Sequence, residues 1–378
     1  MTFKLRNESI VGFMLFIPSI TRIMLVTLGV EFSSHILSAT LYSIAFLLAI
    51  LSNNKIHSLN IAKILHVIFM LDVCHWIYTF TVNIGTSTNL NIPVLMFAQH
   101  CLMVLPVFWI VSNIKCLKQC DDAVKKFARY VATTMLLLYF TKGTVTHMES
   151  YDMSLGYSLV LVGVILLTSF FKDRSKLNLF LSITVLGLAL KFGSRGIILV
   201  YVTSLLINLF YCSFRVRMYS ILACILGALV MYVAYIFGWF EDSRTINLVF
   251  NTDKLLYLSG RDRIFDQLQP YFFNAPLFGN GLGFDRITTN SYGLYAHNIV
   301  LESLVNNGLF ITIILMSFLL LILYKDFTKL KKYYSEVVIS LISMQVQMLI
   351  SSSYVTDVYF WSFVGISLCF LNTKIKED

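Results

Sequence analysis

An arginine near the start of a short helix in the second half of the chain has the surroundings that a phosphate site needs. The run from Ser259 to Leu268 has the pattern of a helix start, because Ser259 can cap the first turn and Asp262 suits that turn. Apolar residues then recur at helical spacing, namely Ile264, Phe265, Leu268 and Phe272. Arg261 falls on this apolar face, whereas the spacing turns Arg263 away from it.

The position of Arg261 suggests what it could bind. A guanidinium at a helix start, beside backbone N–H groups that have no partner within the helix, is suited to a phosphate or pyrophosphate group. The alternative is an interfacial arginine paired with an acidic neighbour such as Asp253 or Asp285. The spacing alone favours neither.

A histidine lies at a second predicted helix start. The glycine-rich run from Phe278 to Gly283 predicts a turn, and the chain then reaches His297 at the beginning of a long apolar segment. A helix N-terminus disfavours the imidazolium, so the ring is expected to be neutral and able to accept a proton. The alternative is a histidine that only forms a hydrogen bond at a loop-to-helix junction, and the residues alone favour that reading.

A third candidate site is the abrupt turn from Lys191 to Gly196. It holds Arg195 between small residues and separates two short apolar segments. A guanidinium beside the bilayer with small neighbours can closely approach a phosphate carried by a lipid. The alternative is an arginine that extends to the membrane interface as an anchor.

The elements that position these residues are expected to be membrane helices. The chain is 57% hydrophobic and 13% charged with a mean hydropathy of +0.77, whereas an ordinary soluble domain is roughly a quarter charged. The formal net charge of +9 does not indicate a nucleic-acid partner, because the basic residues form short clusters between apolar runs. Such clusters are typical of cytoplasmic loops.

About twelve segments are apolar enough to cross ~30 Å of hydrocarbon, which takes roughly 17 to 25 residues. They are Ile10–Leu28, His35–Leu51, Ile61–Val82, Ile92–Ile114, Phe127–Lys142, Leu155–Phe171, Leu179–Phe192, Ile197–Cys212, Tyr219–Phe240, a segment ending at Tyr324, Val337–Ser353 and Thr356–Leu371. We therefore predict an all-α polytopic transmembrane protein. Residues 1–239 would form an N-terminal bundle of about nine helices, 240–297 one large external loop with short helices, and 298–378 the C-terminal transmembrane helices.

The orientation follows from the distribution of Lys and Arg. When alternate loops are assigned to opposite sides, one side holds dense clusters such as Lys115–Arg129 and Lys325–Lys332. The other side holds few basic residues, most of them in the large loop: Lys142, Lys191, Arg195, Arg244, Lys254, Arg261, Arg263 and Arg286. The positive-inside rule then predicts two cytoplasmic termini and a large loop on the external face.

The seven cysteines favour neither a disulfide framework nor a metal site. Five of them lie inside apolar stretches, and Cys116 and Cys120 lie in one basic loop. The large loop contains no cysteine and no clustered acidic motif of the kind that holds a divalent cation. No metal and no cofactor are therefore expected.

Four short motifs in order resemble the bacterial O-antigen polymerase and O-antigen ligase superfamily. They are Ser194-Arg195-Gly196, Ser259-Gly260-Arg261-Asp262-Arg263-Ile264, Pro276-Leu277-Phe278-Gly279-Asn280-Gly281-Leu282-Gly283, and His297-Asn298-Ile299-Val300-Leu301-Glu302 running into Asn307-Gly308. The resemblance covers about Lys191 to Leu323. The N-terminal half is similar only in being a helical membrane protein.

The resemblance implies a metal-independent, inverting glycosyltransferase in the bacterial inner membrane, with His297, Arg261 and Arg195 as catalytic residues. It further implies that Arg263, Lys191, Asn298 and Glu302 bind substrate. The donor and the acceptor would both be glycans linked to undecaprenyl pyrophosphate, polymerised on the external face into a surface polysaccharide. Membrane lipids and a chain-length regulator are the other expected partners, and nucleic acid is not one.

Two other functions compete with the polymerase. A ligase that transfers the finished glycan to lipid A-core would carry the same motifs, and no residue separates the two. A transporter of lipid-linked sugars should place ionisable residues inside the membrane. The apolar segments hold few such residues, and Asp72 with His75, one turn apart, is the pair of interest for that alternative.

Overall fold

The computed structural model describes residues 7–28, 34–51, 59–85, 91–141, 153–192, 195–218, 261–288 and 295–372, together with a few positions between 220 and 237. At some helix ends, Lys191, Arg195 and Arg261 among them, only the backbone is described and not the side chain.

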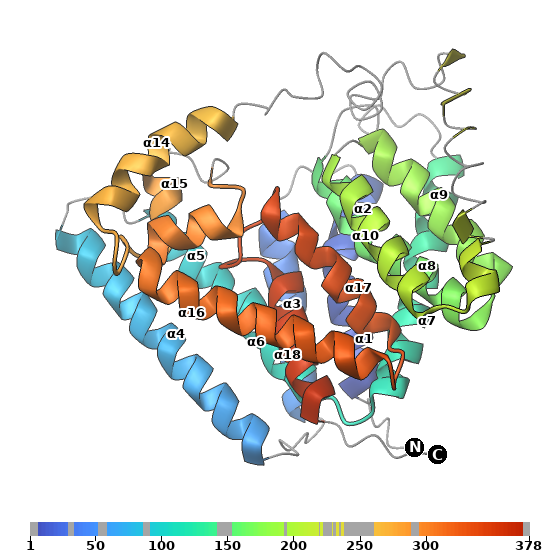
Figure 1. The fold of residues 1–378 in the computed structure, drawn as a ribbon, viewed down its shortest axis with the longest axis horizontal. Helices are drawn as coiled ribbons and strands as arrows, with labels where there is room; N and C mark the ends of the chain where they lie inside the picture. Colours follow the sequence, from blue (N-terminus) through green and yellow to red (C-terminus); the bar gives the residue numbers. More distant parts are fainter. Residues whose placement is uncertain are drawn as a thin grey trace.

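The described residues form helices and contain no strand, which confirms the all-α class (Figure 1). In chain order the helices are α1 Asn7–Leu15, α2 Ile17–Leu28, α3 Ser34–Leu51, α4 Leu59–Gly85, α5 Asn91–Gln99, the π-helix η1 His100–Val104, α6 Leu105–Ser112, α7 Leu117–Thr141, α8 Met153–Asp173, α9 Lys176–Phe192, α10 Arg195–Tyr211, α14 Arg261–Asn274, α15 Phe284–Thr288, α16 Ile299–Leu330, α17 Glu336–Met344, the 3₁₀-helix η2 Gln345–Leu349 and α18 Val358–Asn372.

Four of the described helical stretches are long and apolar enough to cross a membrane, namely Ser34–Leu51, Asn91–Ser112, Leu155–Asp173 and Ile299–Leu330. A fifth is added if α1 and α2, bent by 52° at Phe16, are taken as one span. All the predicted segments except Tyr219–Phe240, most of which lies outside the described residues, overlap helices. Several of these helices have short apolar runs, so the structure supports an apolar helical bundle but not a count of twelve spans.

The bundle is packed most closely around α8. Its residues from Leu159 to Leu166 are almost wholly inaccessible to solvent. Gly163 allows α10 to approach, because a Cβ at this position would lie 1.4 Å from the hydroxyl oxygen of Tyr201. The Ser182 hydroxyl on α9 donates to the Gly163 carbonyl at 2.7 Å. In contrast, α4 lies along the outer edge of the bundle and exposes apolar side chains such as Leu71 (Figure 1).

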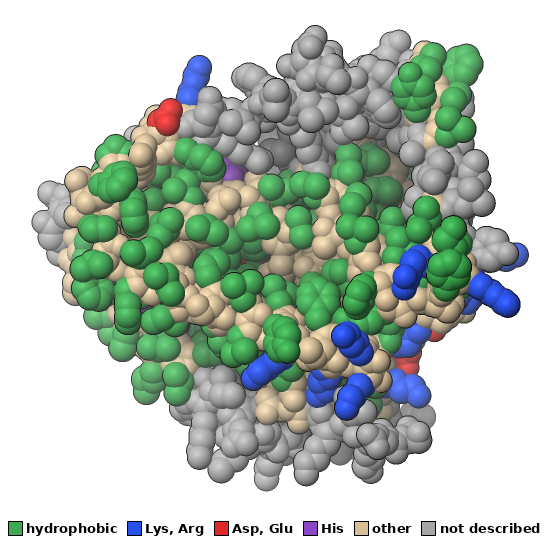
Figure 2. All heavy atoms as spheres, viewed as in Figure 1, with side chains coloured by type: hydrophobic (Ala, Val, Ile, Leu, Met, Phe, Trp, Pro, Cys, Tyr) green, Lys and Arg blue, Asp and Glu red, His purple; other side chains and the backbone are tan. Residues whose placement is uncertain are grey.

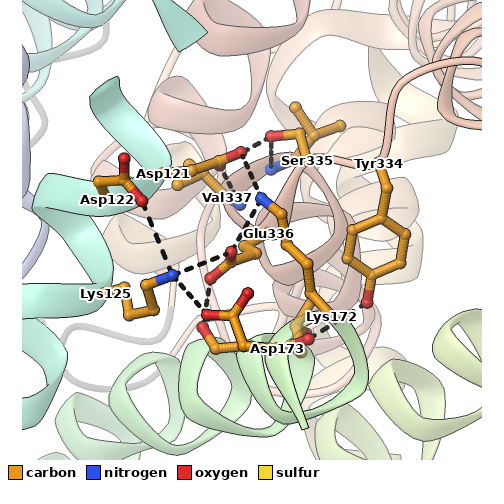
Figure 3. Close-up of polar contacts among 12 residues, drawn as sticks. Asp121, Asp122, Lys125, Lys172, Asp173, Tyr334, Ser335, Glu336 and Val337 are labelled. Atoms are coloured by element: carbon orange, nitrogen blue, oxygen red, sulfur yellow. Dashed lines mark hydrogen bonds and ion pairs between the residues drawn. The ribbon is translucent and has the colours of Figure 1, made fainter. Parts of the chain in front are cut away.

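Buried ion pairs join α7, α8 and α17 at one end of the bundle (Figure 3). Asp121 and Glu336 are both fully buried. The Lys172 ammonium lies 2.9 Å from a Glu336 oxygen and 3.7 Å from an Asp121 oxygen, and Lys125 lies 2.7 Å from Asp173. Asp121 also accepts hydrogen bonds from the Ser335 hydroxyl and the Val337 amide, at 2.9 Å and 3.0 Å. These contacts fix the start of α17 against α7.

The pH dependence of stability should report on Asp121, which lies before the predicted apolar segment of α7. Burial raises its pKa to about 7, although the Lys172 charge and the Val337 N–H oppose the shift. The folded state then holds this proton more tightly than the unfolded state, so the free energy of unfolding should fall as pH rises from about 4 to about 7. Asp121→Asn keeps an acceptor oxygen but cannot ionise, so it should lack this fall. Melting temperatures of both proteins in detergent between pH 4.5 and 8 test this. A wild-type advantage that grows with pH would show that the Lys172 pair outweighs burial.

Basic side chains gather at the same end of the bundle. Figure 2 shows most of the visible Lys and Arg side chains in the lower right of the view, beside a broad apolar surface. The first helix, α1, begins at this end, where Glu8 accepts from the Lys115 amide at 3.3 Å. The last helix, α18, ends here, where Lys329 donates to the Leu371 carbonyl at 3.3 Å. The chain leaves this end through α17 and η2. Residues 350–357, called the connector below, therefore lie at the other end of α17.

Candidate functional site

The predicted helix start at His297 is confirmed to within one residue. Asn298 is the N-cap of α16, and its side-chain oxygen accepts from the amides of Val300 and Leu301 at 2.9 Å and 3.1 Å. Its side-chain nitrogen donates to the Leu349 carbonyl at 3.1 Å. These contacts give Asn298 a structural role, and its predicted role in substrate binding stays a prediction.

His297 occupies a special backbone position directly before this cap. Its φ of 53° lies in the left-handed region, which is uncommon for a residue with a side chain and marks positions that the surroundings must enforce. Its ring is packed on Tyr295, with the ring centres 3.9 Å apart and the planes 39° from parallel. The side chain is half-buried. The histidine is thus at a helix start with a defined ring position.

The connector is held to α16 by buried polar groups. The Ser353 hydroxyl donates to the Glu302 carboxyl, and the Tyr354 amide donates to it at 3.3 Å. The Asn307 side chain donates to the Tyr354 hydroxyl at 2.7 Å. Glu302 is fully buried. Glu302 therefore fixes the connector beside the helix start, and the substrate-binding role that the family resemblance implies for it stays a prediction.

The glycine-rich turn fits into a break in α16. At Gly308 the helix is interrupted, with φ 72° and ψ 178°. An unbroken helix would join the amides of Leu309 and Phe310 to the carbonyls of Val305 and Asn306. Here those amides donate to Pro276 and Leu277, at 2.7 Å and 3.3 Å, and those carbonyls accept from Asn280 and Gly281, at 3.1 Å and 2.8 Å. The turn therefore satisfies these four backbone groups, each of which would cost ~1–3 kcal/mol if buried without a partner.

A methyl group added at Gly308 should push the glycine-rich turn away from α16. A Cβ at Gly308 would lie 2.4 Å from the Leu277 carbonyl, and the φ of 72° disfavours any side chain. We expect Gly308→Ala to lower stability by at least ~2 kcal/mol. Gly187→Ala is the matched control, because nothing lies within 4 Å of its added Cβ and alanine favours a helix. Thermal unfolding in detergent measures both, and an unchanged melting temperature for Gly308→Ala would contradict the fit.

A buried carboxylate joins the turn to the approach to His297. Asp285 on α15 accepts from the Ala296 amide and from the Asn306 side chain, both at 3.1 Å. The next residue, Arg286, is buried and places its guanidinium carbon 4.5 Å from the centre of the Tyr295 ring. Asp253 and the side chain of Arg261 lie outside the described residues. The pairing of Arg261 with an acidic neighbour therefore remains an open alternative.

The predicted phosphate-binding helix is present as α14, which begins at Arg261. It packs through the fully buried Leu268 against Ala296 and Val305, with Ile264 and Phe272 alongside. Phe265 does not join this face and is 41% exposed, because the contact involves a narrower stripe than the sequence suggested. Arg263 is exposed, in agreement with its expected orientation. Position 261 lies two turns before Leu268, ~10 Å along the axis.

The start of α10, which carries Arg195, lies beside the connector. Lys191 is in the last turn of α9, and Arg195 is the first residue of α10. The backbone next to Arg195 is tightly packed, because a Cβ at Gly196 would lie 2.8 Å from the Tyr157 hydroxyl and 3.0 Å from the Ile350 side chain. This packing places the start of α10 against the connector, which also accepts the hydrogen bond of Tyr295.

The structure thus brings three predicted segments to one end of the bundle. The starts of α10 and α16 meet at the connector, and α14 packs on Ala296 next to His297. Sequence reasoning missed the residues that join them, chiefly Arg286, Tyr295, Ser353 and Tyr354. Ser351-Ser352-Ser353-Tyr354 was the available signal, since four consecutive polar residues between two apolar segments are unusual. Asn306-Asn307-Gly308 was a second, because it interrupts an apolar run with helix-breaking residues.

No protein-family model matches this chain, and no curated protein matches it. Among the residues that the structure describes, no three His, Cys, Asp or Glu side chains are grouped so that they could hold a metal ion.

Proposed function

We propose that this chain is a membrane glycosyltransferase that polymerises undecaprenyl pyrophosphate-linked repeat units on the external face of the bacterial inner membrane. The convergence of the segments that carry Arg195, Arg261 and His297 at the connector end of the bundle carries the proposal. These segments lie far apart in the sequence, and they are the ones whose motifs resemble the O-antigen polymerase and ligase superfamily.

The residue types suit such a transfer. Pyrophosphate is a good leaving group, but it gains negative charge as the glycosidic C–O bond breaks. Arg195 and Arg261 would stabilise that charge, and preorganised donors of this kind contribute on the order of 3 kcal/mol each. His297 would orient or deprotonate the acceptor hydroxyl, which attacks the anomeric carbon from the opposite face and inverts it. Lys191 and Arg263 would assist in binding the lipid-linked substrates.

The proposal requires α14 to face outward and the buried ion pairs to lie near the cytoplasm. Asp266 is exposed on α14, and Lys118 is exposed at the basic end. We expect a membrane-impermeant maleimide to label Asp266→Cys in intact spheroplasts and Lys118→Cys only after lysis, relative to the unsubstituted chain. The reverse pattern would overturn the topology and with it the external site.

The glycans of a deletion strain test the function itself. Loss of a polymerase leaves lipid A-core that bears a single repeat unit. Loss of a ligase, the nearest alternative, leaves unmodified core together with lipid-linked polymer.

One observation favours a transporter as a second candidate. Asp72 on α4 is paired with His100 rather than with the nearby His75, at 3.0 Å, and the other ring nitrogen of His100 lies 2.9 Å from the Val355 carbonyl. Both ring nitrogens of His100 are therefore engaged inside the bundle, one by a carboxylate and one by a backbone carbonyl. His100 lies in a π-helix, a feature frequent at functional sites. A transporter would differ in the deletion strain, because lipid-linked repeat units would accumulate on the cytoplasmic face.

A further inference from the structure

One aromatic ring contacts both a buried cation and the predicted catalytic histidine. The Tyr295 ring has the Arg286 guanidinium carbon 4.5 Å from its centre and the His297 ring centre 3.9 Å from it. The Arg286 guanidinium carbon and the centre of the His297 ring are therefore at most 8.4 Å apart, which is the sum of these two distances. The three side chains therefore form one unit, which we call the Tyr295 stack.

The Tyr295 stack is fixed to the connector. The Tyr295 hydroxyl donates to the Ser351 carbonyl at 2.6 Å. Burial raises the pKa of Tyr295, although the Arg286 charge opposes the shift, so the phenol keeps the proton that this hydrogen bond needs. The Tyr295 ring is thus held through its hydroxyl and contacts the Arg286 guanidinium and the His297 ring.

The orientation of an imidazole ring is not fixed by the histidine side chain itself. The terminal torsion of a histidine is broad and roughly two-fold, so an unsupported ring can present either nitrogen to a substrate. His297 also stands at a φ of 53°, outside the regular helix that begins at Ile299. An aromatic ring packed on the imidazole removes this freedom, and a nearby cation favours the face of that aromatic ring.

We infer that Tyr295 is a positioning residue that holds the His297 ring, beside the Arg286 guanidinium, in the orientation in which it meets the acceptor hydroxyl. The effect of Tyr295 on turnover rests on the proposed function. The packing of Tyr295 on His297 does not, so turnover and packing are tested separately.

The first test is a mutant cycle measured as turnover of purified protein with lipid-linked donor and acceptor. Tyr295→Phe keeps the ring but loses the hydrogen bond to the Ser351 carbonyl, so it should lose clearly less turnover than the leucine variant. Tyr295→Leu should lower turnover by roughly tenfold to a hundredfold with little change in KM, since a misplaced group loses catalysis on this scale. In a His297→Gln background the same leucine change should have almost no further effect. An equal loss in both backgrounds, or no loss in the wild-type background, would overturn the inference.

The second test needs no activity. Diethyl pyrocarbonate modifies exposed imidazoles, and mass spectrometry follows the rate at His297, with His75 on α4 as the reference in the same samples. Tyr295→Leu should raise the rate at His297 several-fold and leave His75 unchanged, whereas Tyr295→Phe, which keeps the ring, should raise the rate at His297 by less. Tyr295→Met replaces the leucine variant if that variant does not accumulate in the membrane. An unchanged rate at His297 would overturn the inference. If the wild-type protein shows no turnover, the proposed function is contradicted. The modification rates would then still decide whether Tyr295 holds the His297 ring.

Discussion

Replacing His297 with alanine is expected to lower polymerisation by roughly a hundred- to ten-thousand-fold, which is the range of general acid–base catalysis. The residue stands at the start of α16 with a defined ring position, so its loss removes an oriented acceptor for the hydroxyl proton. The measurement is turnover by purified protein with donor and acceptor lipids supplied. His75→Gln, on the peripheral α4, is the control for a histidine outside the site.

His297→Gln separates the two roles that the imidazole can have. Glutamine can still form a hydrogen bond and position the acceptor, but it cannot take a proton near neutral pH. Turnover close to wild type in this variant would reduce His297 to positioning. Proton removal would then fall to water or to the departing pyrophosphate.

Arg261→Lys is expected to cost on the order of a hundredfold in turnover although the charge is kept. Lysine lacks the planar pair of donors that can grip two phosphate oxygens. Helical geometry supports the choice of position, because residue 261 precedes the buried Leu268 by seven and so falls within about 20° of its face.

Arg263→Lys is the matched control on the same helix. Residue 263 precedes Leu268 by five, which turns it about 140° away, and its side chain is exposed. We expect only a small loss in the same assay, normalised to protein level. Equal losses in the two variants would show that the face of α14 does not decide which arginine meets the substrate.

Periodicity predicted the helices well but not their breaks. The starts of α14 and α16 were found from a cap signal and from the onset of an apolar run, both of which are local features. The break at Gly308 was missed, because its cause is the glycine-rich turn some thirty residues earlier in the chain. Only the folded arrangement shows that the turn supplies the hydrogen bonds that the helix gives up.

The site was predicted in part for the same reason. His297 and the start of α14 could be found from residue type and spacing. Tyr295 and the connector could not, because their importance comes from a contact between residues more than fifty positions apart, that of Tyr295 with Ser351. Arg286 could not either, because its place beside the Tyr295 ring follows from the fold and not from a spacing along the chain. Asn298 shows the converse, since the family resemblance implies that it binds substrate, and only the structure shows that it also caps the helix.

The break in α16 also sets how thick a bilayer this helix matches. An unbroken helix from Ile299 to Leu330 would be ~48 Å long at 1.5 Å per residue, well beyond the ~30 Å of hydrocarbon. After the break, the apolar residues 309–324 measure ~24 Å, slightly less than that thickness, and the lysines that follow can extend to the interface. The nine residues before it, which carry Glu302 and Asn306, are relieved of crossing the apolar layer. The hydrophobic length of α16 is therefore fixed by a contact with the glycine-rich turn and not by the length of its own apolar sequence.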